Sequence, residues 1–158
     1  MQQVKQLSVK GMQRKLWLLG FFKIPMLFFC RPRIIVLNEQ CAKVRIRLKR
    51  RSKNHLGSMY FGALSVGADV AGGILAFCFA ECYGLKISFA FKSFEAQFLQ
   101  RAESDIVFVC NEGDKIKQMV EEAKLKGERI NRFVEVLGQD KTQTIVARFQ
   151  LELSVKVK

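Results

Sequence analysis

Histidine is almost absent from this chain of 158 residues, in which His55 is the only copy. The five cysteines are an odd number, and no pair of them has the CxxC spacing. Zinc sites are built largely from cysteine and histidine, so the chain has little from which to assemble one. We therefore expect no metal site, and we interpret the cysteines as reduced core residues of a cytoplasmic protein.

Acidic residues are also scarce, because 14 Asp and Glu stand against 27 Lys and Arg, which gives a formal charge of +13. Such an excess favours anionic partners: nucleic acid, acidic lipid headgroups, or a phosphate-bearing small molecule. Nucleic-acid binding has no further support, since the basic residues are spread widely and the chain has neither a Cys/His finger nor an aromatic–glycine RNA motif. We expect no nucleic-acid partner.

The N-terminal region lacks an apolar run long enough to span a membrane. Residues 16–29 follow several basic residues and superficially resemble a signal peptide, but Lys23 and Pro25 interrupt the run. It is also shorter than the roughly 20 residues that a spanning helix needs. Apolar spacing predicts a helix over residues 3–23 that ends before Pro25 and packs on the domain. Peripheral membrane contact through this helix is the alternative.

The first half of the remaining chain has the pattern of two strands and one buried helix. Residues 33–37 are mainly β-branched, and residues 41–50 alternate between an apolar face and a face of Lys and Arg. Residues 58–82 are too long for a strand, so we interpret them as a central helix. Glycines recur in this helix and indicate close approach to a neighbouring surface.

The second half of the chain predicts four strands and one short helix. In the first of these strands the apolar positions change parity, which predicts a β-bulge near Lys92–Ser93. The helix would be capped by Asn111 and end at Gly127. The strands cover residues 86–99, 105–110, 130–137 and 144–157.

These elements predict an α+β fold, because the alternating βαβ units of a doubly wound sheet are missing. One long apolar helix followed by a run of strands favours a curled antiparallel sheet of about six strands wrapped around that helix. The chain fits one domain over residues 1–158, in which residues 1–29 form an N-terminal helical extension.

Asp69 is the only formally charged residue between Ser58 and Phe79. Burying an ionised carboxylate in such an apolar segment is costly unless the group is paired, solvated or used. We therefore interpret Asp69 as a functional residue, with a hydrogen bond to neighbouring backbone as the structural alternative.

The order of elements and the residues around Asp69 resemble the hotdog fold over roughly residues 30–158, and within it the phenylacetate-type acyl-CoA thioesterases. In that family an asparagine before the central helix is followed by a histidine, a glycine pair and an acid further along the helix. The corresponding positions of this chain are Asn54, Tyr60, Phe61, Gly62 and Asp69. Tyrosine thus replaces the histidine and phenylalanine replaces the first glycine, as in a less characterised hotdog branch that has tyrosine there.

The resemblance implies hydrolysis of acyl-CoA thioesters at an interface between two subunits of a homodimer or tetramer. Asp69 would be the base or the attacking carboxylate, and the N–H groups of Phe61 and Gly62 would polarise the thioester carbonyl. Asn54 would orient the thioester or a water molecule. Tyr60 would form the pocket wall, or its hydroxyl would donate where the family's histidine acts.

Coenzyme A is polyanionic, so basic residues near the central helix are candidates to bind it. These are Arg50, Arg51 and Lys53, together with the basic strand face at residues 43–49. His55 lies in the same loop and is the one imidazole that could act as a base or contact substrate. Coenzyme A would enter as part of the substrate, so we expect no separate cofactor.

Two other hotdog functions stay open at this point. The missing histidine and first glycine favour a non-catalytic protein that binds acyl-CoA or lipid, and Asn54 is also compatible with ordinary turn chemistry. A hotdog dehydratase normally needs a histidine facing an acid, and His55 is not predicted to lie there.

Overall fold

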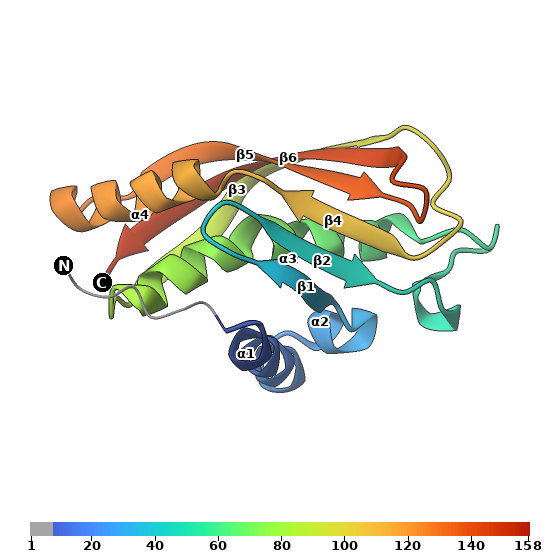
Figure 1. The fold of residues 1–158 in the computed structure, drawn as a ribbon, viewed down its shortest axis with the longest axis horizontal. Helices are drawn as coiled ribbons and strands as arrows, with labels where there is room; N and C mark the ends of the chain where they lie inside the picture. The colour runs from blue at the N-terminus through green and yellow to red at the C-terminus, as the bar shows by residue number, and fades with distance from the viewer. Residues whose placement is uncertain (1–7) are drawn as a thin grey trace.

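The computed structural model describes residues 8–158, in which six strands form one antiparallel sheet with the order β1-β2-β4-β5-β6-β3. The sheet curls around the long helix α3 (Phe61–Cys82), as expected from the sequence (Figure 1). The strands are β1 (Arg33–Leu37), β2 (Ala42–Ile46), β3 (Ile87–Phe98), β4 (Ile106–Cys110), β5 (Ile130–Gln139) and β6 (Ile145–Val157).

The α3 helix is the core of the protein rather than a membrane span. Within the described residues it is the one helix whose length and hydropathy would suffice to cross a membrane, and 78% of the relevant window is buried inside the protein. Small residues of α3 let the sheet pack close to the helix backbone. A Cβ added at Gly67 would lie only 2.1 Å from Cε2 of the buried Phe108 ring. The predicted glycine-rich contact is therefore confirmed.

The β3 strand contains the predicted bulge. Its pairing with β6 shifts register between Phe91 and Ser93, so that one extra residue, Lys92, is accommodated. Phe89 and Phe91 before the bulge and Phe94 after it pair with Val155, Leu153 and Leu151 of β6, all fully buried. Both halves of β3 therefore turn their apolar side chains to the same face.

The β2 strand is shorter than predicted, since it ends at Ile46 rather than near Arg50. The backbone N–H of Leu48 donates to Oδ1 of Asp105 at 2.9 Å instead of continuing a strand ladder. The chain then forms a short 3₁₀ turn, η1 (Arg50–Ser52). A carboxylate 57 positions away in the sequence thus ends the strand, which alternation alone does not reveal.

The N-terminal extension consists of two helices. The predicted helix is confirmed as α1 (Val9–Phe22), whose first turn is capped by Ser8, while residues 3–7 of the prediction lie outside the described part of the chain. A second helix, α2 (Pro25–Cys30), was not predicted. Pro25 ends the first helix but also starts the second, because its fixed φ suits the first helical position.

The inserted helix α4 (Gly113–Lys126) ends at Gly127 as predicted, with a left-handed φ of 67° at that glycine. The predicted cap is wrong: Glu112, not Asn111, precedes the helix, and no side chain caps it. The first residue of the helix, Gly113, packs against the backbone of Glu39, where an added Cβ would lie 2.0 Å from the carbonyl oxygen. Only glycine fits at this position.

Candidate active site

Asn54 lies in the turn that leads into α3, and its side chain forms hydrogen bonds within that turn. Its Oδ1 accepts from the backbone N–H groups of Leu56 at 2.9 Å and Ser58 at 3.2 Å, while Nδ2 donates to Oγ of Ser58 at 3.0 Å. This is the turn chemistry that the sequence allowed as an alternative. Asn54 therefore shapes the loop in one protomer, and a role in orienting substrate stays a prediction.

The basic loop before Asn54 is organised by Ser52, for which the sequence predicts no role. Its hydroxyl donates to the carbonyl of Arg47 at 2.7 Å and accepts from the N–H of Lys49 at 2.9 Å, and its side chain is buried. A serine directly after a basic run is the only sequence signal for such a turn.

The candidate phosphate ligands in this loop differ in their surroundings. Arg51 donates to the carbonyl of Phe29 at 3.3 Å and lies 5.5 Å from the centre of its ring, so it anchors the loop to α2. Arg50, Lys53 and His55 are exposed. The basic face of β2 lies across the sheet from α3, because the alternate residues of that strand, Ala42 to Ile46, are buried toward the core.

The α3 helix begins at Phe61, three residues later than predicted, with Tyr60 at its cap position. No side chain caps this end, so the N–H groups of the first turn, including those of Phe61 and Gly62, point outward without a helical partner. The Tyr60 ring covers Gly62: an added Cβ would lie 2.5 Å from its Cε1. Tyr60 is 46% exposed and packs on the Phe61 ring at a centroid distance of 4.6 Å, as a wall of this open helix end.

Asp69 lies half-buried on α3 and is not paired within the described residues by a hydrogen bond or an ion pair. Burial alone raises the pKa of its carboxyl above the ordinary value, and no cation or donor offsets the effect. The structural alternative, a carboxylate bonded to nearby backbone, is therefore not what the structure shows. A buried carboxylate whose desolvation is not offset by a partner is typical of a functional site.

The side of α3 that carries Asp69 faces β3. One row of the helix, at every fourth residue, contains Phe61, Asp69 and Phe77. The Phe61 ring lies 6.5 Å from Phe98, and the Phe77 ring lies 4.5 Å from Phe89. Gly73, one helical turn after Asp69, also faces β3, because an added Cβ would lie 3.1 Å from Cε2 of Phe89.

The surface beside this row is apolar and open. Phe61 is 58% exposed and Phe98 is 51% exposed, although both belong to the inner side of the fold. Neighbouring exposed residues of the same kind are Tyr60, Phe94 and Leu99. The candidate site thus combines an acid, a helix end with unpaired N–H groups and an exposed apolar surface.

The acid and the helix end do not meet within one protomer. Asp69 follows Phe61 by eight residues, which corresponds to about 12 Å along a helix at 1.5 Å per residue. A thioester carbonyl held at the first-turn N–H groups is thus out of reach of the Asp69 carboxylate in the same chain.

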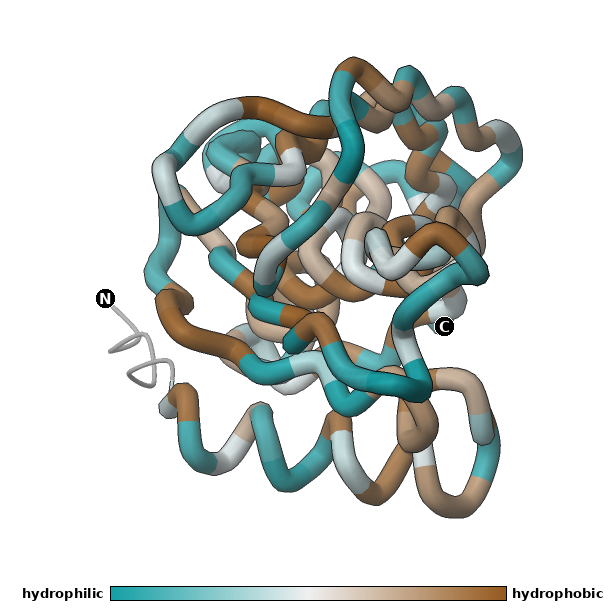
Figure 2. The backbone as a smooth tube through the Cα atoms, turned by 90° about the vertical axis from the view of Figure 1, so that its right-hand side faces the viewer, coloured by the Kyte–Doolittle hydropathy of each residue, from teal (hydrophilic) through white to brown (hydrophobic). Residues whose placement is uncertain are grey.

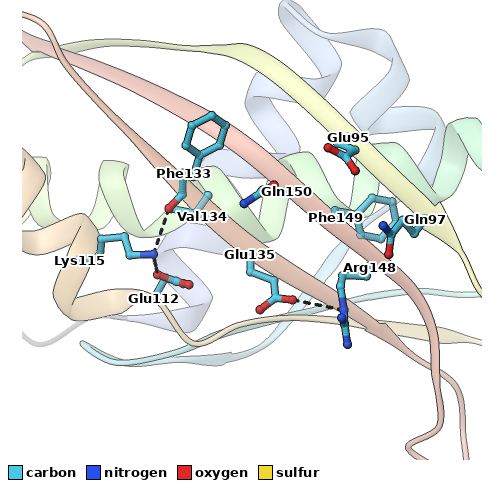
Figure 3. A pocket seen from close by; sticks show the side chains of 10 residues that line it. All are labelled: Glu95, Gln97, Glu112, Lys115, Phe133, Val134, Glu135, Arg148, Phe149 and Gln150. Atoms are coloured by element: carbon cyan, nitrogen blue, oxygen red, sulfur yellow. Dashed lines mark hydrogen bonds and ion pairs between the residues drawn. The ribbon is translucent and has the colours of Figure 1, made fainter.

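The hollow of about 340 Å³ on the opposite, outer face of the sheet is not this site (Figure 3). Its lining is charged, and both of its cations are already paired: Lys115 pairs with Glu112, and Arg148 Nε lies 3.3 Å from Glu135 Oε1. None of the residues predicted for catalysis or substrate binding lines it. We interpret it as a solvated face of the sheet.

Solved structures share this architecture over nearly their whole length. A Pseudomonas aeruginosa protein of unknown function, named a probable thioesterase, is 23% identical with a TM-score of 0.79, and the alignment covers 98% of this chain and 99% of that one. A Chlorobaculum tepidum protein of unknown function is 11% identical with a TM-score of 0.82, covering 97% and 99%. A Haemophilus influenzae thioesterase is 13% identical with a TM-score of 0.67, covering 99% and 96%.

The protein is a hotdog-fold protein, as the curled six-stranded sheet around α3 and these neighbours show. Residues 14–155 match the family described as Domain of unknown function (DUF4442), and the chain belongs to that family. No curated protein sequence matches it.

Proposed function

We propose that this protein hydrolyses acyl-CoA thioesters, or related acyl thioesters, at a site formed between two copies of the chain. The observation that carries the proposal is Asp69, an unpaired, half-buried carboxylate on a core helix beside an open apolar surface. Structural neighbours named as thioesterases support the same reaction class.

The residues present are those that thioester hydrolysis requires. The Asp69 carboxylate would take a proton from water as it attacks the carbonyl carbon, or would attack that carbon itself. The N–H groups of Phe61 and Gly62 would stabilise the negative charge that develops on the carbonyl oxygen. The C–S bond then breaks, and the thiolate leaves and is protonated to the free thiol. After attack by water the carboxylic acid is released directly, and after attack by Asp69 a water molecule first hydrolyses the acyl–Asp69 anhydride.

A homodimer would bring these groups together, since β3 ends the sheet with an unpaired edge of 12 residues. Pairing of two such edges would place the exposed aromatic residues of each chain against the other. Asp69 of one chain would then face the α3 end of its partner. Such dimers could associate further into a tetramer.

Coenzyme A would bind as part of the substrate, with no separate cofactor or metal in the reaction. We assign its phosphates to Arg50 and Lys53, which are exposed in the loop before α3, with Arg51 holding the loop on α2. His55 lies exposed in the same loop and would contact the substrate there. We place the protein in the cytoplasm, where acyl-CoA is made and used.

The direct test is release of free thiol from acyl-CoA substrates of increasing chain length, at micromolar protein. We expect saturable turnover, best for acyl groups that fill the apolar surface around Phe61 and Phe98. Absence of thiol release across the whole panel, with a folded and dimeric protein, would refute the proposal.

Acyl-CoA binding without hydrolysis is the second candidate function. The rings of Tyr60 and Phe61 lie at the helix end that would hold the carbonyl, and Asn54 is already bonded to its own turn. Saturable binding of a non-hydrolysable acyl-CoA thioether together with no turnover of the thioester would favour this function.

The shared site predicts rescue between two inactive variants. Phe61→Pro removes one N–H donor at a position where proline suits a helix, because Tyr60 already has an extended backbone with φ −62° and ψ 138°. A heterodimer of this variant with Asp69→Asn, purified through two different tags, contains one intact site. It should show about half of the parent activity per dimer if the dimer is symmetric.

Phe61→Ala, which keeps the N–H group, is the matched control and should retain more activity than Phe61→Pro as a homodimer. A heterodimer that is as inactive as its two parents would place the site within one chain and would contradict the shared arrangement.

A further inference from the structure

The α1–α2 surface is strongly apolar although it faces solvent. Seven large hydrophobic side chains of this surface are between 40% and 73% exposed. They are Trp17, Leu18, Phe21, Phe22, Ile24, Met26 and Phe29. Figures 1 and 2 place both helices at the edge of the molecule, with one side turned away from the sheet.

The α1 helix has apolar residues on both its inner and its outer side. Met12, Leu16 and Leu19, which are three and four residues apart, pack on the core from the inner side of the helix. Trp17 and Phe21, also four residues apart, lie on the opposite side, where they are exposed. A Cβ added at Gly20 would lie 2.8 Å from the backbone N of Phe28, so α1 and α2 are in close contact. The apolar surface is therefore held on a rigid pair of helices.

The aromatic rings on this surface are ordered against one another. Trp17 stacks on Phe21 at a centroid distance of 5.6 Å, and Phe28 lies edge-on at 5.9 Å from Trp17 and 5.4 Å from Phe21. Phe22 packs edge-on against Phe21 at 4.9 Å. Tryptophan is enriched at the boundary between water and lipid hydrocarbon, and Trp and Phe are typical of the apolar face of helices that lie in that boundary.

The charge around the aromatic surface has one sign. The first 38 residues contain seven Lys and Arg residues and no acid, and Glu39 is the first carboxylate in the chain. Lys10 and Arg14 are exposed on the preceding turns of the outer side of α1. At α2, the Arg31 guanidinium lies 5.9 Å from the Phe28 ring centre. Glu81 of α3 lies close to α1, but its carboxylate is paired with Lys15.

We propose that the α1–α2 surface docks the protein on bilayers that contain anionic phospholipids. The aromatic and aliphatic side chains would enter the headgroup region, and the surrounding Lys and Arg would bind the lipid phosphates. A second copy of the chain is a poorer occupant, because a symmetric contact through this surface would bring two basic surfaces of like charge together. The edge expected to pair with another copy, β3, also lies at the far end of the sheet from β1, on which α1 packs.

Trp17 is the only tryptophan in the chain, so its fluorescence reports directly on this surface. The full-length protein is titrated with vesicles of phosphatidylcholine alone and of phosphatidylcholine with phosphatidylglycerol. We expect a blue shift of the emission, protection from acrylamide and cosedimentation, each with the anionic vesicles and each reduced by added salt. An emission spectrum unchanged by anionic vesicles would overturn the proposal.

Two variants distinguish lipid docking from self-association through the same surface. Phe22→Ser, at a side chain 73% exposed, should weaken vesicle binding about tenfold without loss of folding, because little apolar contact is removed from the protein itself. Leu125→Ser, at a side chain 86% exposed on α4, is the matched control and should bind as the parent does. If Phe22→Ser instead changes the oligomeric state measured by light scattering while the parent does not bind vesicles, the surface is a subunit interface and the proposal is wrong.

Discussion

Asp69→Asn is expected to slow thiol release from the best acyl-CoA substrate by about 10²–10⁴-fold, the usual contribution of a positioned general base. Asparagine has nearly the same shape but can neither accept the proton of the attacking water nor attack the carbonyl as a carboxylate. Because the substitution leaves the apolar surface intact, we expect the loss in kcat with little change in KM. Steady-state kinetics of the purified variant measure both.

Glu95→Gln is the matched control for loss of a carboxylate, because Glu95 lines the charged hollow on the outer face of the sheet. Its activity should equal that of the parent. The reverse result, an active Asp69→Asn and an inactive Glu95→Gln, would move the site to that hollow and contradict the function proposed for Asp69.

The same Asp69→Asn variant should be more stable than the parent at neutral pH. Burial raises the pKa of Asp69 in the folded state, so the folded protein favours the protonated form, and the stability linked to this group is lost as the pH rises through the raised pKa. Asparagine cannot ionise, so the advantage of the variant should shrink as the pH falls. Urea unfolding at several pH values measures it, while the parent's activity should fall in acid as the base becomes protonated.

Gly67→Ala is expected to lower the free energy of unfolding by about 2–3 kcal/mol, as overpacking of a tight core does. The added methyl would lie 2.1 Å from Cε2 and 2.3 Å from Cζ of Phe108, a ring with no exposed surface. That ring also packs against Phe149 at 6.1 Å and has little room to move. Thermal unfolding should shift down by about 5–10 °C for a chain of this size.

Gly72→Ala in the same helix is the control, because its added methyl would meet Val136, Leu151 and Val134 at ordinary distances of 3.4 to 3.7 Å. It should be neutral or slightly stabilising, since alanine favours helix over glycine. Gly67→Ala should also cost less in a Phe108→Leu background, where the clashing ring is gone. Equal stability of the Gly67 and Gly72 variants would show that the contact with Phe108 is not tight.

Local patterns in the sequence are sufficient to predict most of the fold. The β-branched run at residues 33–37 identifies β1, the change of parity identifies the bulge in β3, and the long apolar segment with glycines identifies α3. The exceptions come from contacts between distant residues. Asp105 ends β2 from 57 positions away, and the start of α4 at Gly113 packs against the backbone of Glu39.

The candidate site is harder to predict for a related reason. The apolar setting of Asp69 is visible in the sequence, and the structure confirms that the carboxylate is partly buried, which raises its pKa. The competing uses of a side chain are not visible. Arg51 is predicted to bind phosphate, yet it anchors η1 to α2. Of the two roles that the sequence allows for Asn54, the structure shows the turn.

The bulge in β3 also bears on how the protein avoids aggregation. An edge of 12 residues with exposed phenylalanines is a template on which further chains could add without limit. The extra residue, the exposed Lys92, breaks that edge into two short stretches and puts a charge between them. A bulge and a charged residue on an edge strand are two of the means by which proteins hinder the addition of further strands.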